Sequence, residues 1–197
     1  MLAGTLLDDR SMPPLREVIG TLLSCARRAD FAIGNVRLAA IDLSDLELAR
    51  LVSCRLLLDR LDVNMLADAA TVRGTDAQAA RNLNVMNAFA RSGRLEIRAA
   101  GRTCWSPDFS VFHGLPVSAV AVDGAACLVG AHYFSQPVAR DGVSLTCALT
   151  GPAAVRDAAA HFESLWGRAH DVLPVVRELV GELVRPPAGR RRRAWTR

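Results

Sequence analysis

The chain has 197 residues and a mass of 21.2 kDa, which suits one α/β domain with at most a short appendage. Hydrophobic residues make up 51% and charged residues 22%, a composition that excludes an intrinsically disordered chain. No apolar run reaches the roughly 18 residues that a membrane-spanning helix needs. The first ten residues lack the features of a signal peptide, so we predict a cytoplasmic protein without a membrane span.

The formal net charge of +4 is concentrated at one end of the chain. Residues 185–197 contain six arginines and no acid, so residues 1–184 carry about −2, the total less the six charges of the tail. There is no lysine in the chain. Arginines bind phosphates bidentately and tryptophan stacks on bases, which predicts DNA or RNA binding by this segment. The alternative is a solvated, disordered tail that only aids solubility. The candidate binding residues are Arg190, Arg191, Arg192, Arg193 and Trp195.

Helix and strand patterns alternate through the first half of the chain. Residues 11–14, with two prolines, open a helix whose apolar residues recur at helical spacing to about residue 28. Residues 30–38 form a compact apolar run that is typical of a buried strand. A capping box at residues 44–47 opens a second helix, and residues 55–63 form a second candidate strand.

In the second half, a helix begins at a capping box at residues 75–78 and ends at Ser92-Gly93, followed by an alternating strand over residues 94–99. We predict a loop for residues 100–115. Two apolar runs, 117–122 and 125–130, flank Asp123-Gly124 and predict a hairpin. The remaining expected elements are a strand at residues 144–149, a helix from Pro152 and a helix from about residue 172 to Pro186-Pro187.

This order of elements predicts an α/β fold, a mixed β-sheet flanked by helices on both faces. We expect a single domain over residues 1–184 and a tail over residues 185–197. The five cysteines lie far apart, without a CxxC pair, which argues against a zinc site and against a disulfide framework. Glycine-rich phosphate-binding loops are absent from the sequence, so we expect no cofactor and no metal.

The run VSAVAVDGAACLVG at residues 117–130, followed by AHYF, resembles the signature hairpin of the phospholipase D superfamily. That family carries HxKxxxxD on the first strand, a DG turn and then a vGSxN segment. The upstream order of strands and helices is similar to the same family, and the resemblance covers about residues 15–170. It implies a phospholipase D-like fold in a single copy. It also implies a homodimer, since single-copy members pair to build one groove.

In that family a histidine attacks phosphorus, a second copy's histidine protonates the leaving oxygen, and lysines hold the phosphate oxygens. Aligned on Asp123, the histidine position of this chain is Pro116 and the lysine position is Ser118. Asp123 and Gly130 match the family, whereas the serine and the asparagine of the second segment are both replaced. A proline cannot accept a proton or attack phosphorus, so we predict that catalysis has been lost.

We therefore predict a catalytically degenerate, dimeric scaffold or nucleic-acid-binding accessory protein, with a larger protein complex or a small-molecule ligand as further partner classes. The alternative is a divergent, metal-independent phosphodiesterase or nuclease. Its candidate catalytic residues are Asp123, His113 and His132, which would replace the missing set. The competing structural interpretation keeps Asp123 for the turn and has both histidines hydrogen-bonded to water or backbone.

Overall fold

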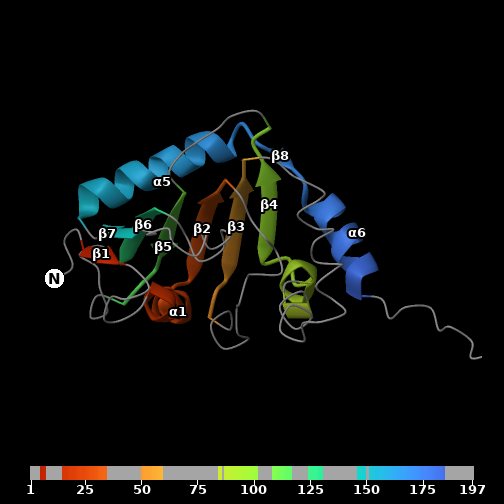
Figure 1. Cartoon of the computed structure of the whole chain (residues 1–197), viewed down its shortest axis with the longest axis horizontal. Helices are drawn as coiled ribbons and strands as arrows, with labels where there is room; N and C mark the ends of the chain where they lie inside the picture. The colour runs from red at the N-terminus through yellow and green to blue at the C-terminus, as the bar shows by residue number, and fades with distance from the viewer. Residues whose placement is uncertain are drawn as a thin grey trace, which may run out of the picture.

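The computed structural model of the chain describes residues 5–7, 15–34, 50–59, 84–85, 87–101, 108–116, 124–130, 146–149 and 151–184. An eight-stranded sheet runs through them with helices on both faces, which confirms the predicted α/β class (Figure 1). In spatial order the strands are β1 (Thr5–Leu7), β7 (Thr146–Leu149), β6 (Ala125–Gly130), β5 (Phe109–His113), β2 (Arg28–Ile33), β3 (Ser53–Leu58), β4 (Leu95–Ala99) and β8 (His170–Asp171).

The sheet is mixed, because β2, β3 and β4 are parallel to one another and the other neighbouring strands pair antiparallel. The register sets Asp30 of β2 opposite Arg55 of β3, and Arg28 of β2 opposite His113 of β5. Side chains alternate between the two faces along a strand. This register therefore brings Arg28, Asp30, Arg55 and His113 to the same face of the sheet.

Helix α5 (Pro152–Trp166) covers that face (Figure 1). It begins with a proline directly after Gly151, where the missing N–H costs no helical hydrogen bond. Its inward stripe consists of Val155, Phe162, Leu165 and Trp166, all buried. None of the helices in the described ranges is long and apolar enough to cross a membrane.

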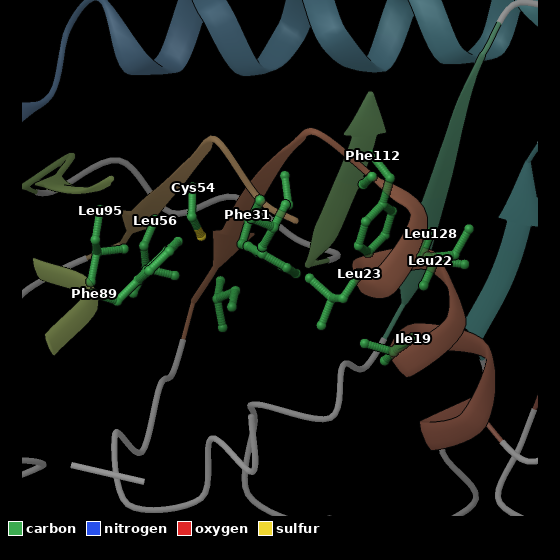
Figure 2. Close-up of a cluster of buried hydrophobic side chains, with 14 of the residues drawn as sticks. Ile19, Leu22, Leu23, Phe31, Cys54, Leu56, Phe89, Leu95, Phe112 and Leu128 are labelled. Carbon is green, nitrogen blue, oxygen red and sulfur yellow. The ribbon is translucent and has the colours of Figure 1, made fainter. Parts of the chain in front are cut away.

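The opposite face carries the larger core, which α1 (Leu15–Cys25), α6 (Leu173–Val184) and the helical residues 84–85 and 87–91 line. Figure 2 shows α1 directing Ile19, Leu22 and Leu23 toward the sheet. There Phe31 and Phe112 meet edge to face, with ring centroids 5.7 Å apart. The two faces of the sheet therefore differ: the face under α1 and α6 is apolar, and the face under α5 carries charged residues as well as apolar ones.

The structure corrects the predicted hairpin. Strand β6 is hydrogen-bonded along one edge to β5 and along the other to β7, so its hairpin partner is residues 109–113, which we predicted as part of a loop. The expected strand 117–122 and Asp123 lie outside the described residues. Four of the five residues of β5 are buried, so the strand lacks the alternation by which a half-buried strand is identified. The short edge strands β1 and β8 were also not predicted.

Candidate functional site

A cluster of charged side chains lies between the sheet and α5. At its centre is Asp30, whose side chain is 1% exposed. Arg55 donates from Nε to Oδ1 at 2.8 Å and from Nη2 to Oδ2 at 2.9 Å, a bidentate pair. Arg28 donates from Nε to both oxygens at 3.1 Å and from Nη2 to Oδ2 at 2.7 Å. We name Arg28, Asp30, Arg55, His113 and Glu163 the Asp30 cluster.

Glu163 of α5 forms the outer layer of the cluster. Its Oε1 accepts hydrogen bonds from Nη2 of Arg28 at 2.8 Å and from Nη2 of Arg55 at 2.6 Å, and its Oε2 accepts one from Nη1 of Arg55 at 3.1 Å. The Arg55 guanidinium also lies over the rings of Phe162 and Trp166, 4.8 Å and 5.1 Å from their centroids. Arg55 is therefore fixed by two carboxylates and two aromatic rings.

The charges of the cluster stabilise one another. Burial would raise the pKa of Asp30, but hydrogen bonds from His113, Arg55 and Arg28 outweigh burial and hold this pKa well below its usual range. Burial likewise opposes the charge of Arg55, yet hydrogen bonds to Asp30 and Glu163 raise its pKa above the ordinary value. At neutral pH two guanidinium groups therefore face two carboxylates.

His113 is the one sequence-predicted catalytic candidate within the described residues. It ends β5 instead of lying in a loop, its side chain is 27% exposed, and its Nε2 is 2.9 Å from Oδ2 of Asp30. An ionised carboxylate only accepts hydrogen bonds, so Nε2–H donates. The partner is thus a buried carboxylate, whereas we expected water or backbone. A histidine oriented in this way has the arrangement used in acid–base and nucleophilic catalysis.

The other predicted site residues lie outside the described residues: Asp123, His132, Arg190, Arg191, Arg192, Arg193 and Trp195. Asp30, Arg28, Arg55 and Glu163 were not predicted from the sequence. Their signal was a charge at the first residue of each of two predicted strands, at Asp30 and Arg55. A buried charge of this kind requires a partner, but the sequence does not say which one.

The β5–β6 pair shows which residue lies opposite the glycine of the second family segment. Gly130 N–H donates to the carbonyl oxygen of Asp108 at 2.9 Å, just before β5 begins. His113 lies at the other end of β5, opposite Ala125. His113 therefore does not stand beside Gly130, whereas His161 of α5 packs on Phe109, the strand partner of Val129, with ring centroids 5.6 Å apart. Pro116, the histidine position in the alignment on Asp123, is exposed.

A second polar group lies where β2 and β3 end. Asp108 Oδ1 accepts a hydrogen bond from Gly34 N–H at 2.7 Å, and burial raises the pKa of Asp108. Asp59, directly after β3, has a buried Oδ1 without a hydrogen-bond partner. Within the described ranges, no three His, Cys, Asp or Glu side chains are grouped so that they could hold a metal ion.

The sheet order and the helices on its faces define a phospholipase D-like fold. Nuc, a phospholipase D family member from Salmonella typhimurium, is 11% identical and superposes with a TM-score of 0.51, over 86% of this chain and 97% of that chain. NucT from Helicobacter pylori is 7% identical, with a TM-score of 0.52, over 85% of this chain and 98% of that chain.

A third similar structure is TrmBL2, an archaeal chromatin protein described as showing a novel mode of DNA binding. It is 14% identical, with a TM-score of 0.50 over 86% of this chain, and the present chain spans 54% of its length. Comparison of the sequence with models of protein families found no match, and comparison with curated proteins found none. The fold is shared with these proteins at sequence identities that carry no residue roles across.

Proposed function

We propose that the protein is a catalytically degenerate phospholipase D-like domain that binds nucleic acid and acts as a homodimeric scaffold or accessory protein. The residue at the family's histidine position carries this proposal. Aligned on Asp123 it is Pro116, which is exposed and has no group that can attack phosphorus or accept a proton. The chain also contains no lysine to hold a phosphate oxygen in the transition state.

Nucleic-acid binding is supported by charge and by fold. Six arginines at residues 185–197 supply the excess positive charge of the chain, and arginine contacts to phosphates release counterions. A similar fold also occurs over 54% of TrmBL2, whose structure is described in terms of DNA binding. We assign the contacts to Arg190, Arg191, Arg192, Arg193 and Trp195, with the arginines on phosphates and the tryptophan stacked on a base.

The test is fluorescence anisotropy of end-labelled single-stranded and double-stranded DNA, with EDTA present and salt varied from about 50 to 200 mM. We expect a stable, salt-sensitive rise in anisotropy with intact DNA. The double variant R192Q/R193Q should weaken binding and flatten its salt dependence. The control R91Q/R177Q removes two exposed arginines from the described helices and should change binding less. Equal effects of the two double variants would contradict the assignment to the tail.

The pair of His113 and Asp30 favours a second candidate, a divergent metal-independent phosphodiesterase. The same samples, analysed on a denaturing gel, distinguish the two functions. We expect no shortened DNA. Cleavage in EDTA that disappears in H113Q but persists in H170Q, a change of an exposed histidine in β8, would overturn the degenerate assignment.

A further inference from the structure

The two arginines of the Asp30 cluster converge on one point. Nη2 of Arg28 and Nη2 of Arg55 both donate to Oε1 of Glu163, at 2.8 Å and 2.6 Å. Two guanidinium groups that share one oxyanion oxygen have the geometry with which arginines bind phosphate. The oxygen they share here belongs to a side chain of the same molecule.

The inner and outer carboxylates of the cluster differ in exposure. Asp30 is 1% exposed and binds both guanidinium groups on their buried side, so it fixes the positions of the two arginines and is not displaced. Glu163 is 52% exposed, Arg28 is 38% exposed and Arg55 is 11% exposed, so the arginine pair meets solvent on the side of Arg28. The ion pair of Glu163 with Arg28 is exposed and contributes little to stability, so an incoming anion can take the place of the Glu163 carboxylate from this side.

We propose that Arg28 and Arg55 form a phosphate-binding fork that Glu163 caps, and that a backbone phosphate of a nucleic acid displaces this cap. The inference rests on the proposed function and adds to it a contact in the folded body, besides the arginine-rich tail. Ordering two arginine side chains normally costs conformational entropy when a ligand binds. In this fork both arginine side chains are already ordered before a ligand binds. Each is hydrogen-bonded to the buried carboxylate of Asp30, and Arg55 also packs on the rings of Phe162 and Trp166.

Glu163 also determines the net charge of the site to which a phosphate would bind. With Glu163 in place, two guanidinium groups balance two carboxylates, and the pKa of Glu163 is held below its usual value chiefly by its hydrogen bond from Arg55. Displacing Glu163 leaves two positive charges against one negative charge. The variant E163Q should therefore bind phosphate more tightly than the wild type, and R28Q more weakly.

The experiment measures inorganic phosphate binding by calorimetry at constant ionic strength, with chloride as the reference anion, on the full-length protein. We expect E163Q to bind about tenfold more tightly, the equivalent of one charge-assisted contact. R28Q should bind phosphate more weakly than the wild type, and circular dichroism tests whether both variants are folded. E178Q, which removes an exposed acid from α6, is the matched control for net charge and should bind as the wild type does.

The anisotropy titration of DNA is then repeated with the same variants. Tighter phosphate binding by E163Q but not by E178Q supports the fork, and a parallel gain in DNA affinity supports the nucleic acid as its ligand. Phosphate binding at the fork without DNA binding by any variant keeps the fork and overturns the proposed function. DNA binding with identical phosphate and DNA affinities for E163Q and E178Q keeps the proposed function and overturns the fork.

Discussion

A single carboxylate organises the charged face of the sheet. Asp30 accepts hydrogen bonds from Arg28, Arg55 and His113, which reach it from three neighbouring strands. Removing one partner of a buried ion pair leaves the remaining charges without compensation. At the residue scale, Asp30 is therefore the position where the smallest chemical change should have the largest effect.

We expect Asp30→Asn to lower the free energy of unfolding by about 3 kcal/mol at pH 7. The folded-state pKa of Asp30 lies below its ordinary value of 3.8, so its contribution is complete above that value and is lost as the pH falls toward the folded-state pKa. The difference between wild type and variant should be constant from pH 7 to about pH 5 and shrink below about pH 4. Urea unfolding at several pH values measures it.

Asp157→Asn is the control, because it removes an exposed carboxylate from α5. We expect this change to alter stability by no more than about 0.5 kcal/mol. Equal losses in the two variants, or a loss for Asp30→Asn that grows as the pH falls, would contradict the role assigned to Asp30.

At the scale of elements, the sequence predicts best where one face of an element is polar. The amphipathic pattern around Ile19, Leu22 and Leu23 predicted α1, and the alternation around Ile97 predicted β4. Strand β2, buried on both faces, was predicted from its apolar run, whereas β5 was missed because its sequence, FSVFH, interrupts the apolar run with a buried serine, Ser110. The order of strands, and hence the partner of β6, depends on contacts between distant segments that local patterns do not encode.

A glycine in the left-handed region lies at each end of the connection between β5 and β6. Gly114 follows β5 with φ +71°, and Gly124 precedes β6 with φ +66°. A Cβ at Gly124 would lie 3.1 Å from the carbonyl oxygen of Leu115. Gly124→Ala should therefore destabilise the protein by about 1–2 kcal/mol, measured as a shift of the urea midpoint. Gly151→Ala, in open space at φ −65°, should cost less, about 0.5 kcal/mol, because alanine is only a poorer N-cap of α5 there. Similar midpoints for both variants would contradict this account of the turn.

For the whole molecule, the sequence predicted the fold class and one residue of the candidate site, His113, but not the other four residues of the Asp30 cluster. The apolar face under α1 follows from hydrophobic patterns. The Asp30 cluster instead arises from the register of β2 with β3 and β5, and from where α5 crosses the sheet. Neither the register nor the crossing point is determined by the local sequence of Arg28, Asp30, Arg55, His113 or Glu163.

Because one copy of this fold would supply half of a groove, we expect the full-length protein to be a homodimer. Light scattering coupled to size-exclusion chromatography should give twice the 21.2 kDa mass of the chain. The measurement is made after nuclease treatment and at about 0.5 M salt, which screens contacts through bound nucleic acid. The mass of a single chain under these conditions would exclude the homodimeric scaffold.

The pairing of β1 with β7 has a consequence for synthesis of the protein on the ribosome. Strand β1 (Thr5–Leu7) is hydrogen-bonded to β7 (Thr146–Leu149), so β1 cannot pair with its partner strand until residue 149 has been synthesised. At roughly 5–20 residues per second, this takes on the order of ten to thirty seconds. Strands β2 and β3 can pair long before then, while β1 keeps unpaired backbone groups. Among the described strands, β1 therefore remains without its partner for the longest part of synthesis, accessible to chaperones and to mispairing with neighbouring chains on a polysome.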